Sequence, residues 1–542
     1  MTLDDCESEY PPRELAAGAQ VVRAAPSPTG RPHIGTAMAA LINRAVADQS
    51  GGIFILRIED TDRKRLDERA VDDILSALDW LHLMPDEGPR VGGAYGPYAQ
   101  SERLRLYEAA AQWLLEQGHA YYCFCAPERL ESMRQAQSAA GQLPMYDRFC
   151  RRCDPEEAAR RVNAGERAVI RMKVPPNTKI EFEDPLRGRI VFDSVQVDDQ
   201  VLIKSDGFPT YHLAVVVDDH FMRVTTAVRG EEWISSTPKH LLLYGYLGWA
   251  PPRIVHMPLL RDESKRKLSK RTGDTSISWF RRQGYLPEGL LNFISRIIWA
   301  HPEEKDFYPY EEFVRLFRLE DVSKAAPVAD HDILDHVNSL YMRELSPQQK
   351  YEAVLEMIAQ NEAAEADALA FDEVKKSGRE TRQVSRQELA RFAAAFRADP
   401  GFSQRVLTVE PERFKKLSDV MLQYSFFFPD LFATPSNELL AKPLNDPWLA
   451  ADVLRRYLER YDHSDPHEPW EAKVRQLAEE AGVKARALFM TIRVAVTGSE
   501  QTPPLYDILQ VLGQTEVERR LGLAIEALGV AAAARGRTAS SA

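Results

Sequence analysis

The segment between residues 21 and 62 constrains the fold of this chain more strongly than any other. It starts with a short apolar strand, passes through a loop of proline, serine and glycine, and enters an alanine-rich stretch that predicts a helix. A second apolar strand, over residues 53–58, leads directly to Glu59. This order predicts half of a parallel nucleotide-binding sheet, whose ligands bind beyond the carboxyl ends of the strands. His33 and Gly35 stand at the start of the predicted helix, where backbone N–H groups favour phosphate.

A basic cluster far downstream supports the same kind of site. The sequence KLSKR, residues 267–271, follows an apolar segment that predicts a strand over residues 254–260. Such clusters are usually solvated surface. A loop that carries Lys267 and Lys270 also suits a triphosphate, because the charge that develops on a leaving pyrophosphate must be stabilised.

The two segments resemble the signature motifs of class I aminoacyl-tRNA synthetases, and more narrowly those of the bacterial glutamyl enzymes. His33-Ile34-Gly35-Thr36 is similar to the first motif, HIGH, and KLSKR is similar to the second, KMSKS. The resemblance covers roughly residues 21–523. It implies an α/β fold, in which a Rossmann-type class I catalytic domain carries an inserted acceptor-binding domain and is followed by an all-α anticodon-binding region.

Eight consecutive regions are predicted along the chain. They are a polar, partly disordered N-terminal extension (1–19), the first half of the catalytic domain (20–103), the inserted domain with a zinc site (104–213), the second half of the catalytic domain with the KLSKR loop (214–275), a stem-contact domain (276–344), two helical anticodon-binding subdomains (345–435 and 436–534) and a disordered tail (535–542). Within the first helical subdomain, residues 361–370 predict a helix and residues 375–385 a surface loop. Asp446-Pro447 predicts the cap and first turn of a helix.

The resemblance implies that the chain activates L-glutamate with ATP and transfers it to tRNA(Glu). Mg²⁺ should accompany ATP, held mainly by phosphate oxygens. The substrate carboxylate is already a nucleophile, so positioning and charge stabilisation should dominate the chemistry. The residues that match the family's ATP contacts are Pro26, His33, Gly35, Lys267 and Lys270, of which His33, Gly35 and Lys270 would be catalytic.

A dicarboxylate substrate needs cationic anchors and an acceptor for its ammonium group. Arg23 matches the family's ligand for the side-chain carboxylate, and Arg229 matches a second substrate-binding arginine. An arginine fork suits bidentate carboxylate recognition better than lysine does. Glu59 matches the acceptor for the ammonium, and Ser27 and Tyr211 complete the predicted pocket. Arg57 and Arg63 are read only as solvated charges.

Four of the five cysteines cluster in the predicted insertion. Their C-x-C and C-x-x-C spacing is typical of a structural zinc site with thiolate ligands. The predicted ligands are Cys123, Cys125, Cys150 and Cys153. Because the fourth ligand varies among the enzymes that this segment resembles, Tyr146 is an alternative to Cys153.

Anticodon reading is predicted in the C-terminal third. Arg413 aligns with an arginine that some family members use to reject the anticodon of the glutamine tRNA, and Thr497 lies in a turn that resembles a tRNA-contact segment. The net charge of −12 does not argue for a nucleic-acid partner, but a local basic face is sufficient for phosphate contact.

Composition and alternatives complete the prediction. No run of eighteen apolar residues and no secretory signal occur, so a cytosolic protein is expected, and the family implies a monomer. One alternative is a non-discriminating enzyme that also charges tRNA(Gln). Another is a non-catalytic tRNA-binding paralogue, and the cysteines alone would also fit a zinc-stabilised nucleic-acid-binding module.

Overall fold

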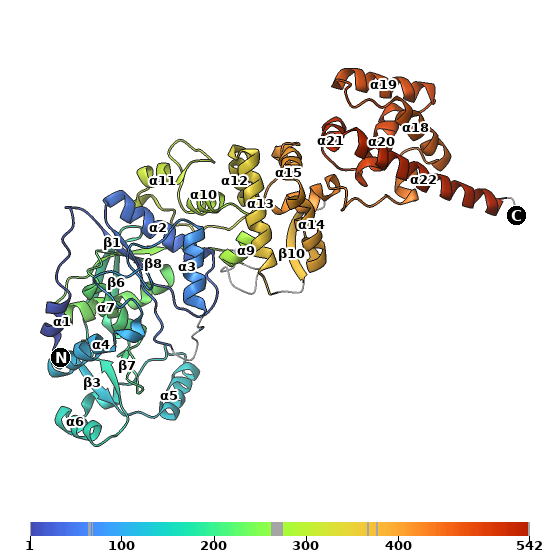
Figure 1. Cartoon of the computed structure of the whole chain (residues 1–542). Coiled ribbons are helices and arrows are strands. Elements are labelled where there is room, and N and C mark those ends of the chain that lie inside the picture. Colours follow the sequence, from blue (N-terminus) through green and yellow to red (C-terminus); the bar gives the residue numbers. More distant parts are fainter. Residues whose placement is uncertain are drawn as a thin grey trace. The chain divides into compact units, whose positions relative to one another are not determined.

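The computed structural model describes most of the chain in two compact units. The first unit contains residues 1–279 and 290–334, and the second contains residues 280–289 and 335–542. Figure 1 shows the chain and labels many of its helices and strands. The described residues are 2–62, 67, 69–261, 275–365, 368–375 and 378–539. No helix within these ranges is long and apolar enough to cross a lipid bilayer.

The first unit contains a parallel sheet of four strands. Their order is β2 (Ile53–Leu56), β1 (Val21–Ala24), β8 (Thr226–Gly230) and β9 (Arg253–Met257). The sequence segments on either side of the insertion therefore meet between β1 and β8. Helix α2 (Ile34–Ser50) follows β1 and contacts both of these strands. This confirms the predicted strand–helix–strand unit.

The inserted segment forms a separate layer of antiparallel structure. One sheet contains β3 (Ala120–Cys123), β4 (Val169–Met172) and β7 (Val201–Ile203). A hairpin pairs β5 (Lys179–Asp184) with β6 (Gly188–Asp193) and contacts β9 of the parallel sheet. The insertion is thus tied to the catalytic sheet through this hairpin.

Helices cover the rest of the first unit. They are α3 (Ala70–Trp80), α4 (Leu104–Glu116), α5 (Pro127–Ala139), α6 (Pro155–Asn163), α7 (Tyr211–Phe221), α8 (Thr237–Leu247) and α11 (Tyr310–Leu316). Helix α8 starts at Thr237-Pro238, where a proline costs no hydrogen bond. The chain passes between the units within α9 (Ile277–Gln283), α10 (Pro287–Ile298) and α12 (His331–Glu344).

The N-terminal extension is ordered, which corrects the prediction of partial disorder. Residues Leu3–Glu9 form α1, with a capping box at Thr2. Cys6 is fully buried in the core of the first unit, together with Tyr10. Glu7 accepts hydrogen bonds from Arg223 and pairs with His220. Buried apolar contacts and ion pairs therefore hold a segment whose polar composition alone predicted a mobile tail.

The second unit is mostly helical. Its helices beyond α12 are α13 (Pro347–Glu362), α14 (Arg386–Ala398), α15 (Pro400–Val406), α16 (Ser418–Tyr424), α17 (Asn437–Ala441), α18 (Pro447–Arg460), α19 (His467–Glu480), α20 (Ala485–Thr497), α21 (Leu505–Leu512) and α22 (Gln514–Ala539). The Asp446 carboxylate accepts hydrogen bonds from the first N–H groups of α18, so the predicted cap is confirmed.

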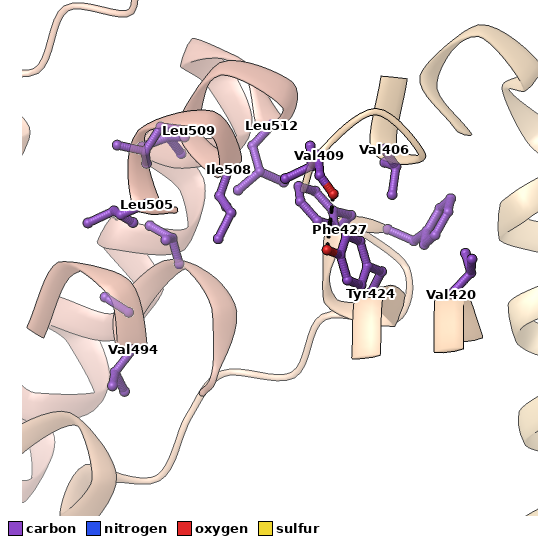
Figure 2. Packing of buried hydrophobic residues seen from close by; sticks show 14 of the residues in the cluster. Val406, Val409, Val420, Tyr424, Phe427, Val494, Leu505, Ile508, Leu509 and Leu512 are labelled. Carbon is purple, nitrogen blue, oxygen red and sulfur yellow. Dashed lines mark hydrogen bonds between the residues drawn. The ribbon is translucent and has the colours of Figure 1, made fainter. Parts of the chain in front are cut away.

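One hydrophobic core runs through both predicted helical subdomains. Figure 2 shows Ile508 and Leu512 of α21 facing Val409 and Phe427. The Tyr424 hydroxyl donates to the carbonyl of Val409 at 3.0 Å. The polar group of this buried tyrosine side chain therefore has a hydrogen-bond partner inside the core. Phe427 and the neighbouring Phe428 belong to this core and are not exposed for stacking on a base.

A β-hairpin corrects the prediction for residues 361–385. Strands β10 (Ala368–Lys375) and β11 (Gly378–Ser385) pair in antiparallel fashion where a helix end and a surface loop were predicted. Leu369, Phe371 and Val384 are buried, and alternation of apolar residues therefore explains the strands. The tail prediction is also corrected in part, because α22 continues to Ala539.

Candidate active site

The candidate site lies at the carboxyl ends of β1 and β8. Arg23 lies near the end of β1, in the first half of the catalytic fold, and Arg229 lies near the end of β8, in the second half. His33 is the N-cap of α2, and its Nδ1 accepts a hydrogen bond from the backbone N–H of Gly35 at 3.0 Å. A Cβ on Gly35 would lie 2.8 Å from Cε1 of His33. Glycine therefore lets the imidazole fold back over the start of the helix.

A cavity of about 250 Å³ adjoins this helix start. Its wall is mostly apolar and includes Met38, Ile42 and Leu260, while His33 and Arg229 bring polar groups to it. Such a cavity, apolar with a few convergent polar groups and next to a helix N-terminus, is typical of a small-molecule site. Lys267 and Lys270, predicted to contact the phosphates, lie outside the described residues.

Arg229 is half-buried at the end of β8, and its guanidinium is held on three sides. Its Nε donates to Nε2 of His256 at 3.0 Å, and its terminal nitrogens donate to Nδ1 of His240 at 2.9 Å and Oγ1 of Thr237 at 2.7 Å. Burial lowers the pKa of Arg229, and the charge of nearby Arg23 acts in the same direction. The two predicted substrate arginines therefore lie close together, as expected.

Arg23 lies in a buried ion cluster. Its guanidinium donates to both carboxylate oxygens of Asp219, at 3.0 and 3.2 Å, and to the carbonyl of Val228. Arg57 is fully buried and donates to the same carboxylate at 2.6 Å and to Glu59 at 3.2 Å. The reading of Arg57 as a solvated charge is therefore wrong.

The carboxylates of this cluster respond to burial in different ways. Burial opposes ionisation of Asp219, but Arg23 and Arg57 lower its pKa overall. For Glu59, burial dominates and raises the pKa, although Arg57 and Arg23 oppose the shift. Glu59 thus lies at the edge of the cluster, where a ligand's ammonium group would favour its ionised form.

The other predicted pocket residues differ in how far they are buried. Tyr211 starts α7, and its ring packs against that of Trp233 at 4.1 Å between centroids with a tilt of 32°. Burial chiefly raises the pKa of Tyr211 to about 12. Ser27 is exposed in the loop after β1. The carbonyl of Pro26 accepts a hydrogen bond from the backbone N–H of Glu59, so this loop is fixed to the end of β2.

The cysteine cluster converges in the inserted domain. The sulfur atoms of Cys123, Cys125 and Cys150 all lie within 4.8 Å of one another. The Tyr146 hydroxyl lies 3.3 Å from the sulfur of Cys123 and 3.4 Å from that of Cys125. Cys153 packs beside this group but is not part of it. The geometry thus favours Tyr146 over Cys153 as the fourth donor.

The two predicted anticodon residues differ in accessibility. Arg413 is half-buried, donating to Gln423 at 3.1 Å and pairing with Glu410 at 3.4 Å. Thr497, in contrast, is 5% exposed, and its hydroxyl donates to the Arg493 carbonyl at the end of α20. The structure therefore gives Thr497 a part in shaping its turn and does not favour a direct contact with RNA.

Several residues of the site were not found from the sequence. His240 and His256 bind Arg229, while Asp219 binds Arg23 and Arg57. The pair Asp218-Asp219 inside an otherwise apolar helix was an available signal, because buried carboxylates are normally paired. The histidines gave no such signal.

Comparisons with known proteins agree with this geometry. Residues 20–336 match the model of the family described as tRNA synthetases class I (E and Q), catalytic domain, and residues 386–525 match that of an anticodon binding domain. The chain is therefore a class I tRNA synthetase, an ATP-dependent ligase.

Relatives narrow this class. A glutamate–tRNA ligase of Gloeobacter violaceus is 57% identical over 97% of this chain and 99% of its own length, and one of Dehalococcoides mccartyi is 40% identical over 94% and 97%. The crystal structure of a glutamate tRNA ligase from Elizabethkingia meningosepticum, in complex with its amino acid, superposes with a TM-score of 0.77 at 30% identity, over 94% of this chain and all of that one. The chain belongs to the glutamate–tRNA ligase family.

Proposed function

We propose that this chain activates L-glutamate as glutamyl-adenylate and transfers it to the 3′-terminal adenosine of tRNA(Glu). The observation that carries the proposal is the position of Arg229, an arginine that lines the same cavity as His33 and Gly35. An anchor for an anionic amino acid thus adjoins a helix N-terminus suited to phosphate.

ATP would bind with its base and ribose in the apolar cavity beside α2. His33, as N-cap, would face the phosphates together with the first N–H groups of α2. Mg²⁺ would be held mainly by phosphate oxygens, and Lys267 and Lys270 would contact the leaving pyrophosphate.

L-Glutamate would bind between the ends of β1 and β8. Its side-chain carboxylate would bind Arg23, and Arg229 would bind the substrate as the second arginine through the N–H groups that its protein partners leave open. Arg23 already holds Asp219 through two hydrogen bonds, so Arg229 would supply the larger share of the new charge-assisted bonding. Glu59 would accept from the ammonium group, and Ser27 and Tyr211 would close the pocket.

Zinc would stabilise the inserted domain. Three sulfurs and one phenol oxygen converge within bonding reach of a single ion, which is the donor set of a closed structural site. In such a site Cys123, Cys125, Cys150 and Tyr146 would fix β3 against the loop before β4, and no step of the reaction would pass through the metal. We further propose that the protein acts as a monomer in the cytosol.

A substitution at Arg229 tests the assignment of the amino acid site. Arg229→Leu should reduce kcat/KM for glutamate on the order of 100-fold in aminoacylation assays, because a charge-assisted interaction of about 1.5–3 kcal/mol is lost. Arg253→Leu is the matched control, since Arg253 starts β9 at the opposite end of the same sheet and pairs with Glu320 on the surface. An unchanged KM for glutamate in Arg229→Leu would remove the basis of the proposal.

A further inference from the structure

Arg229 lies within a continuous chain of polar side chains drawn from five elements. His256 of β9 lies between Arg229 and Asp184 at the end of β5. Its Nε2 binds the Nε of Arg229, and its Nδ1 lies 2.7 Å from the Asp184 carboxylate. On the other side of the guanidinium, a terminal nitrogen of Arg229 binds Nδ1 of His240 in α8. Nε2 of His240 lies 3.1 Å from Nδ1 of His212 in α7. The fold thus brings three histidines around one arginine.

The hydrogen bonds define the tautomer of His256. Arginine has only N–H donors, so Nε2 of His256 must accept from Arg229 and carries no proton. Its proton is therefore on Nδ1 and is donated to Asp184. The backbone N–H of His256 donates to the same carboxylate oxygen at 3.1 Å, so the ring and the strand are fixed together.

The same reasoning applies to His240, which is 2% exposed. Its Nδ1 accepts from Arg229, so its proton is on Nε2 and is donated to Nδ1 of His212. Burial holds the pKa of His240 well below its usual value and lowers that of His212 to about 3. Both imidazoles are therefore neutral acceptors at physiological pH.

Neutral acceptors have a consequence for the charge of the arginine. Among the described residues, Arg229 forms no salt bridge, whereas Arg23 and Arg57 both share Asp219. Three of its five N–H groups are oriented by neutral partners, and one N–H on each terminal nitrogen is left for Tyr211 or for a ligand. The guanidinium is thus held in place, and no direct ion pair among the described residues compensates its positive charge, although the Asp219 carboxylate acts on it from a distance.

We propose that His240 and His256 are positioning residues, which orient the Arg229 guanidinium through neutral imidazole acceptors so that its positive charge is directed at the carboxylate of the amino acid substrate. The inference rests on the proposed role of Arg229 in glutamate binding. A carboxylate in place of either imidazole would neutralise the arginine and compete with the substrate. An apolar side chain in place of either imidazole would leave the N–H group that this imidazole binds without direction. Only a neutral acceptor gives both orientation and charge.

Paired substitutions at His240 separate this role from packing. His240→Asn keeps an acceptor where Nδ1 stands, because Oδ1 of asparagine and Nδ1 of histidine occupy equivalent positions on Cγ. His240→Leu has nearly the volume of histidine and removes the acceptor. At His256 the equivalent pair is His256→Gln, whose Oε1 can replace Nε2, and His256→Leu. The full-length protein is used throughout, and thermal unfolding selects the variants that fold.

Aminoacylation kinetics with glutamate, ATP and tRNA(Glu) provide the readout. In His240→Leu the KM for glutamate should rise about 10-fold or more, while kcat and the KM for ATP change by less than about 3-fold, because binding that is equal in the ground and transition states is lost. His240→Asn should recover most of the affinity despite its smaller volume. His256→Gln and His256→Leu should reproduce the same difference.

Each result decides the question. Recovery by the acceptor-retaining variants supports the positioning role. An equal rise in KM for asparagine and leucine at His240, in folded proteins, would show a packing role and overturn the inference alone. An unchanged KM in His240→Leu would overturn it as well. If Arg229→Leu itself leaves the KM for glutamate unchanged, the proposed substrate role fails, and the inference fails with it.

Discussion

At the scale of single residues, charge pairing decides which arginines are structural and which are available to a ligand. Arg57 is fully buried and holds Asp219 and Glu59, while Arg229 is held by neutral groups. The two residues have the same side chain and lie at the same edge of one parallel sheet, because Arg57 follows β2 and Arg229 lies near the end of β8. Their different partners separate a stabilising role from a binding role.

Removal of Arg57 should therefore affect stability strongly. Arg57→Leu leaves a buried Asp219 with one cation fewer and is expected to lower the free energy of unfolding of the first unit by about 3–5 kcal/mol. Arg90→Leu is the matched control, because the pair of Arg90 with Asp72 is 66% and 51% exposed and such pairs contribute less than about 1 kcal/mol. Chemical denaturation of the two variants measures both values, and similar losses would contradict this account of the cluster.

The buried histidines predict a pH dependence of stability. His240 and His212 have depressed pKa values when folded, so below a pH of about 6.5 the unfolded chain binds protons that the folded chain does not. Stability is therefore present above this pH and is lost as the pH falls, by up to about 1.4 kcal/mol per pH unit for each histidine. His240→Asn should show a smaller fall in Tm between pH 7.5 and 5.5 than the unsubstituted protein. An identical fall would contradict the neutral state of His240.

At the scale of elements, the sequence was informative where local patterns decide the structure. The strand–turn–helix order around β1 and α2 and the cap of α18 were predicted from residues that act within a few positions of each other. Strands β10 and β11 were missed although apolar residues alternate along them, and Gln283, distant in sequence, also holds the first of them. Its amide donates to the carbonyl of Ala370 and accepts from the N–H of Asp372.

The cysteine cluster of the insertion gives a prediction that separates the two proposed sets of zinc ligands. Cys150→Ser should lose zinc and lower the Tm, because Cys150 belongs to the group of converging sulfurs. Cys153→Ser, one turn away in the same segment, should retain about one zinc per chain, because the proposed fourth donor is Tyr146. Metal analysis of the purified proteins distinguishes the two, and loss of zinc from Cys153→Ser would assign the fourth position to Cys153.

At the scale of the whole molecule, the chain combines a catalytic unit and a helical unit that match two separate family models. The class of enzyme could be predicted from the sequence because its two signature segments are short and local. The residues that orient Arg229 could not, because they come from α8, β9 and β5 and meet only in the folded protein. The proposed specificity for one tRNA would likewise depend on the whole chain, since the proposed amino acid site and Arg413 belong to different units.

The most direct test is aminoacylation with labelled glutamate, ATP and Mg²⁺, with purified tRNA(Glu) and tRNA(Gln) in separate reactions. We expect charging of tRNA(Glu) and not of tRNA(Gln), and charging of tRNA(Gln) should increase in Arg413→Ala if this arginine rejects that anticodon. Charging of both tRNAs by the unsubstituted protein would show a non-discriminating enzyme. A folded protein that binds tRNA(Glu) but charges neither tRNA would contradict the central claim that this chain is a glutamate-activating ligase.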